Sequence, residues 1–151
     1  MSNRQAVTPR LLTVGYEGRS LEELIGALAD AGVDRLVDVR ELPLSRRRGF
    51  SKSALSNALS DARIEYLHVK ALGNPKPIRE RYRAGDVEGG AAVYRGYLNN
   101  GSRSALIELA HSLGVDLACL LCFERDHTAC HRNVIVEELQ KLRRELKICH
   151  L

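Results

Sequence analysis

The stretch Asp116-Leu-Ala-Cys-Leu-Leu-Cys-Phe123 decides the fold. After its first residue it is continuously apolar, as a β-strand that is buried on both faces should be. Three more β-rich stretches precede it, over Leu11–Gly15, Leu36–Arg40 and Ile64–Leu72, and helical patterns lie between them. Strands that alternate with helices imply right-handed crossovers and a mostly parallel sheet. The sequence therefore predicts an α/β fold with helices on both faces of the sheet.

Apolar residues at helical spacing fill the segments between these strands. In the last helix Ile135, Leu139, Leu142 and Leu146 recur at spacings of four and three, the period of a buried helix face. A glycine-rich break at Gly85–Gly90 separates two of the middle helices. The expected helices follow Ser20, follow Ser51, lie near Pro77–Arg83, over Ala91–Leu98 and over Arg103–Leu113, and begin near Thr128.

Length and composition predict a single compact domain. A chain of 151 residues suits one domain, and no internal repeat or linker divides it. We expect a flexible tail over residues 1–10 and one domain over residues 11–151. The tail has no apolar signal segment, and no apolar run approaches the ~18 residues that span a bilayer. The four cysteines lie near the end of the chain, unlike a disulfide framework, so we expect reduced thiols, a cytoplasmic location and no membrane contact.

Basic residues are concentrated in two segments of the chain. The net charge is +4 and the pI is about 9.0, which permits an anionic partner without requiring one. Arg46–Arg48 with Lys52 form the first cluster, and the second lies over residues 76–83. Two interpretations stay open at this point: a solvated surface, or a site for an anionic small molecule or nucleic acid.

Ionisable side chains follow every predicted strand. Ligands of parallel sheets bind beyond the carboxyl ends of the strands, so these side chains are expected to meet at one edge. Side chains two residues apart on a strand share a face, which pairs Asp38 with Arg40, His68 with Lys70, and Cys122 with Glu124. Glu124 follows the fourth strand. The alternative is purely structural, with ion pairs that tie loops together, Asp38–Arg40 or Glu124–Arg132.

The segment Thr128-Ala-Cys-His-Arg132 is the most specific local signal. With Thr128 as the N-cap, Cys130 and His131 fall in the first helical turn, where free N–H groups favour an anion or a thiolate. Arg132 offers a planar guanidinium to a phosphate. Against this, His131 also continues the apolar stripe of the helix and is equally well explained as a packed histidine.

The loop over Ser45–Lys52 supplies further candidate ligand contacts. Arg46, Lys52 and the helix start at Ser51 suit a phosphate group, and Phe50 suits either base stacking or a role as a hydrophobic anchor. No complete metal site is predicted. Cys119 and Cys122 lie three apart on a strand and so point to opposite faces.

Several of these elements resemble the family catalogued as domain of unknown function 488. The resemblance runs from about residue 11 to residue 142, and the Cys130-His-Arg132 element is its most distinctive part. Tyr16 and Glu17 stand where that family carries His-Ser. The resemblance implies a compact α/β fold with a site at the strand edge, and it brings no established reaction. The other matching elements are Thr13–Tyr16, Val37–Arg40, Pro43 with Ser45-Arg46, Gly49–Lys52, Tyr66 with His68, Leu72-Gly73 and Cys122-x-Glu124.

Three hypotheses about function follow from these residues. In the first, the protein is a hydrolase of a phosphate-bearing substrate, a nucleotide or nucleic acid. The second is a binding module for nucleic acid or an anionic metabolite, without catalysis. The third is a metal or redox site that uses Cys122, Cys130 and His131, for which a fourth ligand is lacking. Cofactor and oligomeric state are left open. In the enzyme hypothesis the catalytic candidates are Asp38, Glu124, Cys130 and His131, and the ligand-binding candidates are Arg40, Arg46, Ser51, Lys52, His68 and Arg132.

Overall fold

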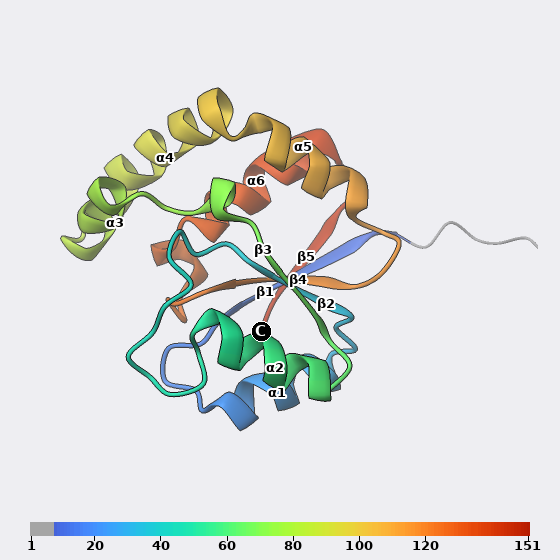
Figure 1. Cartoon of the computed structure of the whole chain (residues 1–151). Coiled ribbons are helices and arrows are strands. Elements are labelled where there is room, and N and C mark those ends of the chain that lie inside the picture. Colours follow the sequence, from blue (N-terminus) through green and yellow to red (C-terminus); the bar gives the residue numbers. More distant parts are fainter. Residues whose placement is uncertain (1–7) are drawn as a thin grey trace, which may run out of the picture.

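The computed structural model describes residues 8–151, which form a five-stranded sheet. Figure 1 shows the sheet between two layers of helices. The strand order is β3-β2-β4-β1-β5, and every neighbouring pair is parallel. The predicted α/β fold is confirmed. Of the tail predicted over residues 1–10, residues 1–7 lie outside the described residues. The strands are β1 (Arg10–Gly15), β2 (Arg35–Asp38), β3 (Glu65–His68), β4 (Ala118–Cys122) and β5 (Lys147–His150).

Helices cover both faces of the sheet, as predicted (Figure 1). Apolar residues of α1 (Leu21–Asp30) and α2 (Lys52–Asp61) pack on one face. The other face is covered by α3 (Lys76–Arg83), α4 (Val87–Gly101), α5 (Arg103–Ser112) and α6 (Arg132–Leu142), and the short 3₁₀ helices are η1 (Lys70–Leu72) and η2 (His127–Ala129). Among residues 8–151 no helix is both long and apolar enough to cross a membrane.

The central strand β4 has the burial that its sequence predicts. It lies between β2 and β1, and all five of its residues are buried. Cys119 packs among the side chains of α1 and α2, whereas Cys122 packs on the side of α6. The two thiols therefore lie on opposite faces, as expected from their spacing.

Two sequence predictions about the C-terminal half are wrong. Helix α6 ends at Leu142, and the chain then forms β5, which pairs Ile148 with Leu11 of β1. Leu146 continues the helical spacing, and β5 is mostly exposed and lacks a clear alternation of apolar and polar residues. The sequence therefore gives no signal for this edge strand. The break expected at Gly85–Gly90 is also too long, because α4 starts at Val87.

The third strand is shorter than expected, since β3 ends at His68 and Lys70 begins the 3₁₀ helix η1. The expected pairing of His68 with Lys70 on one strand face is therefore wrong. The N-cap predictions are confirmed at Ser20, whose side chain accepts a hydrogen bond from the Glu23 N–H at 3.1 Å. At Ser51 the position is right, but the hydroxyl makes no cap hydrogen bond.

Two glycines let loops cross the strand ends at very short range. A Cβ atom at Gly15 would lie 1.8 Å from the carbonyl oxygen of Glu124, so the segment after β4 crosses directly over the end of β1. A Cβ atom at Gly73 would lie 2.4 Å from the Cα atom of Glu41. Both close approaches position loops at the carboxyl edge of the sheet.

We predict that Gly15→Ala lowers the free energy of unfolding by about 2–3 kcal/mol, because the added methyl group must displace backbone rather than a flexible side chain. Gly26→Ala is the matched control, since a Cβ there meets nothing within 4 Å inside α1. That change should stabilise the protein by about 0.5–1 kcal/mol. Denaturant unfolding measures both, and equal midpoints for Gly15→Ala and the parent would contradict the close approach.

Candidate functional site

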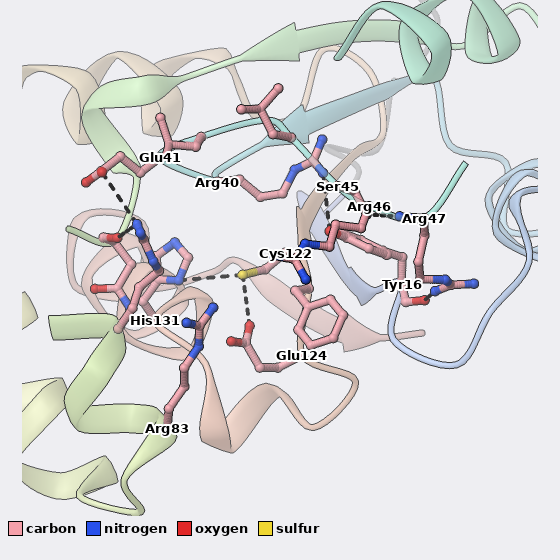
Figure 2. Close-up of a pocket in the computed structure, with 15 residues that line it drawn as sticks. Tyr16, Arg40, Glu41, Ser45, Arg46, Arg47, Arg83, Cys122, Glu124 and His131 are labelled. Carbon is pink, nitrogen blue, oxygen red and sulfur yellow. Dashed lines mark hydrogen bonds and ion pairs between the residues drawn. The ribbon is translucent and has the colours of Figure 1, made fainter. Parts of the chain in front are cut away.

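A cavity of about 550 Å³ lies at the carboxyl edge of the sheet, where β1, β2 and β4 end (Figure 2). We call it the strand-end cavity. Its residues come from the end of β4, from the segments after these three strands, from α3 and the loop before it, and from the N-cap of α6. The lining residues are Tyr16, Arg40, Glu41, Leu42, Leu44, Ser45, Arg46, Arg47, Asn74, Arg79, Arg83, Cys122, Phe123, Glu124 and His131.

Asp38 and Arg40 form a buried ion pair behind this cavity. The Arg40 guanidinium donates to Asp38 through Nη2 at 2.8 Å and through Nε at 2.9 Å, so the expected ion pair is confirmed. The expected strand is too long, because β2 ends at Asp38 and Arg40 lies just after it. The Tyr66 hydroxyl donates to the same carboxylate at 2.5 Å. Burial, together with this hydrogen bond, raises the pKa of Tyr66 well above its ordinary value. Asp38 is fully buried, and both of its oxygens have partners within the fold.

This geometry separates the roles predicted for the pair. Arg40 lines the strand-end cavity, whereas Asp38 does not. A carboxylate that is engaged by Arg40 and Tyr66 and closed off from solvent does not reach a ligand there, so the structural interpretation of the ion pair fits Asp38 better than general-base catalysis. Arg40 also donates to the carbonyl oxygen of Phe50 at 2.7 Å, which connects the pair to the loop over residues 45–52, here called the arginine-rich loop.

An aromatic stack supports the arginine-rich loop from below. Tyr16 stacks on Phe50 with ring centroids 4.6 Å apart, and its hydroxyl accepts from Arg40 at 3.4 Å. Phe50 is buried, which confirms its role as an anchor. Arg47 lies over the Phe50 ring and donates to the Tyr16 carbonyl at 2.9 Å. Sequence reasoning omitted Tyr16 from the site, although its position directly after β1 was the available signal.

Two thiols, an imidazole and a carboxylate form a compact cluster at the inner end of the cavity. Cys122 Sγ lies 3.1 Å from Glu124 Oε2, and His131 Nδ1 lies 3.6 Å from Cys122 Sγ and 3.7 Å from Cys130 Sγ. His131 Nε2 lies 2.8 Å from the Val39 carbonyl oxygen. Because a carbonyl only accepts, Nε2 carries a hydrogen, and in the neutral form of the ring the Nδ1 lone pair faces the two sulfurs.

The start of α6 differs from the prediction. The helix begins at Arg132 with His131 as its N-cap residue, and Thr128 lies in η2, where its N–H donates to Asp126 at 2.9 Å. Cys130 thus precedes the helix and is buried, and burial raises the pKa of its thiol well above the ordinary value. The expectation of a Cys130 thiolate favoured by the first helical turn is wrong, and Cys130 does not line the cavity.

Arg132 holds the loop after β4 rather than lining the cavity. It is buried, and its guanidinium donates to the carbonyl oxygens of Glu124 and Arg125 and to the Thr13 hydroxyl. The expected ion pair between Arg132 and the Glu124 carboxylate is absent from residues 8–151, because the contact is to the backbone of Glu124. That carboxylate is left facing the cavity.

Three other predicted ligand contacts also lie outside the cavity lining. The Ser51 hydroxyl accepts from the Ser45 N–H at 3.0 Å, and His68 Nε2 bonds the Arg40 carbonyl oxygen at 2.8 Å. Lys52 is exposed at the start of α2. Ser51 and His68 therefore fix the backbone around the site, and a ligand contact by any of the three stays a prediction.

Two arginines of α3 belong to the lining and were not predicted as site residues. Arg79 donates to the Asn74 carbonyl oxygen at 2.7 Å and lies 3.4 Å from a carboxylate oxygen of Glu41. Arg83 extends from α3 toward the cluster of Cys122 and Glu124 (Figure 2). Their spacing of four residues, which places both on one face of a helix, was the signal in the sequence.

A family model for the domain of unknown function DUF488 matches residues 20–139. The chain belongs to the DUF488 family. The match confirms the resemblance and includes every lining residue of the cavity except Tyr16. No curated protein matches this DUF488 chain, and no solved structure does.

In this DUF488 protein we predict that Asp38→Asn lowers the free energy of unfolding by about 3 kcal/mol, because the buried Arg40 guanidinium loses its charged partner. The control is Glu145→Gln, which breaks the more exposed pair with Arg143 at 3.1 Å and should lower the free energy of unfolding far less, because solvent screens an exposed ion pair. Chemical denaturation of the parent and both variants measures this. Equal losses of unfolding free energy in the two variants would show that the buried pair contributes no more to stability than the exposed pair.

The burial of the cysteines gives a second prediction for the DUF488 chain. At neutral pH iodoacetamide should alkylate the exposed Cys149 quickly and reach Cys119, Cys122 and Cys130 only after unfolding. Peptide mass spectrometry of native and denatured protein identifies the labelled sites, and Cys149→Ser should abolish the fast phase. Labelling of Cys130 at the rate of Cys149 would instead restore it as a candidate nucleophile.

Proposed function

We propose that the strand-end cavity binds a phosphate-bearing small molecule of the nucleotide class and that Glu124 is the general base in its hydrolysis. The observation that carries the proposal is the pair Arg46 and Arg83. Both line the cavity together with Glu124, and within residues 8–151 neither makes a side-chain hydrogen bond or ion pair. Guanidinium groups that lack a protein partner beside a carboxylate suit an anionic ligand better than a structural role.

The charge balance of the lining supports an anion. Five arginines and two glutamates line the cavity. Arg79 is paired with Glu41, Arg40 is paired with Asp38 behind the wall, and Arg47 donates to the carbonyl oxygens of Tyr16 and Arg19. Within residues 8–151 this leaves Arg46 and Arg83 without a partner. A guanidinium presents parallel N–H donors in one plane, which match two oxygens of a phosphate.

Apolar side chains beside the arginines support a ligand that also has a flat, apolar part. Phe123, Leu42 and Leu44 line the same cavity and remain exposed, Phe123 to 41%. The rings of Phe123 and Tyr16 form an edge-to-face contact with 5.3 Å between centroids, which holds the Phe123 ring in place. Exposed aromatic and aliphatic surface next to guanidinium groups fits a nucleobase joined to a phosphate.

Glu124 is the carboxylate best placed for catalysis. Of the four residues predicted as catalytic, Glu124 and His131 line the cavity, while Asp38 and Cys130 do not. Glu124 would take a proton from the water that attacks phosphorus as the ester P–O bond breaks. The leaving oxygen then gains a proton from the solvent, and the arginines stabilise the charge on the phosphoryl oxygens.

The test is phosphate release from a panel of nucleoside phosphates and sugar phosphates. We expect turnover with nucleoside phosphates and a kcat lowered about 10²- to 10⁴-fold in Glu124→Gln, with KM little changed, because a general base acts on the chemical step. Arg46→Gln and Arg83→Gln should each weaken binding by roughly tenfold or more, since each removes a charge-assisted hydrogen bond.

Matched controls come from the same loop and the same helix. Arg48→Gln and Arg81→Gln remove equal charges from residues that do not line the cavity and should leave binding and turnover unchanged. Salt-sensitive binding that survives Glu124→Gln, with no turnover of any compound, would favour the alternative of an anion-binding module. No binding of any panel member, or equal effects of all four arginine variants, would contradict the proposal altogether.

A further inference from the structure

We propose that Cys122, Cys130 and His131 together bind one transition-metal ion of the zinc class, with a fourth coordination position open to the strand-end cavity. Sequence spacing alone leaves this group short of a fourth ligand. In the folded chain the group has the geometry of a three-ligand site. In such sites the fourth coordination position is left open for water or substrate. The inference goes beyond the phosphate proposal and does not depend on it.

The three donor atoms are clustered, and both nitrogen–sulfur separations match those that one ion requires. The sulfurs of Cys122 and Cys130 and a ring nitrogen of His131 all lie within 4.8 Å of one another. The two distances from Nδ1 to sulfur are 3.6 and 3.7 Å. Tetrahedral zinc with Zn–S near 2.3 Å and Zn–N near 2.05 Å places nitrogen and sulfur about 3.6 Å apart.

The imidazole is held in the orientation that a metal ligand needs. His131 Nε2 donates to the Val39 carbonyl at 2.8 Å, which directs the lone pair of Nδ1 toward both sulfurs. Ligating histidines almost always donate their other ring N–H to a carbonyl or carboxylate in this way. The carbonyl belongs to the segment just after β2, so the site depends on three different parts of the sheet edge.

The donor set selects the class of metal. Two thiolates and an imidazole suit zinc and its cobalt substitute, whereas magnesium and calcium prefer oxygen ligands. Binding releases one proton from each thiol to the solvent, and the two thiolate charges balance a divalent ion in this buried place. Cys119, which is also buried, lies on the opposite face of β4 and is not part of the group.

The open position faces the cavity beside Glu124. Cys122 and His131 line the cavity while Cys130 lies behind them, so the side of the group away from Cys130 is the accessible one. Figure 2 shows Cys122 between His131 and Glu124, and Glu124 Oε2 lies 3.1 Å from the sulfur. Zinc sites with three protein ligands keep the fourth position for water or substrate.

Cobalt titration of the full-length protein tests this site directly. The reduced protein is stripped with a chelator and titrated with Co²⁺ while its visible and near-ultraviolet absorption is recorded. We expect one Co²⁺ per chain, the ligand-field bands of tetrahedral cobalt and a thiolate-to-cobalt charge-transfer band, all displaced by Zn²⁺. Cys122→Ser, Cys130→Ser and His131→Gln should each lose or strongly weaken these bands.

The matched controls are Cys119→Ser and Cys149→Ser, one buried and one exposed, which should keep the bands. Should a ligand variant fail to fold, X-ray absorption of the zinc-loaded parent gives the answer without a substitution, as a shell of two sulfurs at about 2.3 Å with nitrogen or oxygen at about 2.0 Å. A shell without sulfur, bands that persist in all ligand variants, or a Cys122–Cys130 disulfide whose reduction restores no cobalt binding would overturn the proposal.

The two proposals fail separately. Glu124→Gln should keep the cobalt bands and lose phosphate release, because Glu124 is not one of the three ligands. Arg83→Gln should weaken ligand binding and leave the cobalt stoichiometry unchanged. If the protein binds no cobalt, Arg46→Gln and Arg83→Gln should still weaken phosphate binding. If it binds no phosphate, the result of the metal titration should not change.

Discussion

The parallel pairing of β4 between β1 and β2 is the constraint on which the site depends. It brings the carboxyl ends of three strands to one edge, so Tyr16, Arg40 and Glu124 meet although they lie far apart in the chain. Gly15 then allows the backbone after β4 to cross the end of β1 at a range that no side chain would permit. The position of the Glu124 carboxylate follows from this crossing and from the hydrogen bonds of Arg132 to the same loop.

A shell of buried polar contacts surrounds the cavity and fixes its walls. Arg40 is paired with Asp38 and donates to the carbonyl oxygen of Phe50, and the carbonyl oxygen of Val39 accepts a hydrogen bond from the imidazole of His131. The Val39–His131 contact joins the segment after β2 to the start of α6, and the Tyr66 hydroxyl joins β3 to Asp38 of β2. Buried polar groups of this kind are stable only when they are fully paired, so the walls should behave as one rigid unit. What remains free on the cavity side is a set of side chains suited to a ligand.

The sequence was sufficient for the features that depend on local pattern. The apolar run over residues 116–123 predicted a central strand, and the ionisable residues after each strand predicted the edge at which the cavity lies. The pattern failed where local signals compete. Leu146 fits the helical spacing, yet the chain turns into the exposed edge strand β5. Thr128 is of a residue type that is favoured at N-caps. Its N–H instead donates to Asp126, and Thr128 does not cap α6.

The rest of the site could not be read from the sequence because it depends on tertiary packing. Ile78 and Tyr82 bury the adjacent face of α3 in the core, and this packing sets the rotation of the helix that brings Arg79 and Arg83 to the cavity. The most direct test of this cavity as a ligand site is a crystal structure of the protein grown with a nucleoside monophosphate. We expect phosphate density between the guanidinium groups of Arg46 and Arg83, next to Glu124. Density bound at another surface, or Glu124 and the arginines facing different sides of the molecule, would contradict it.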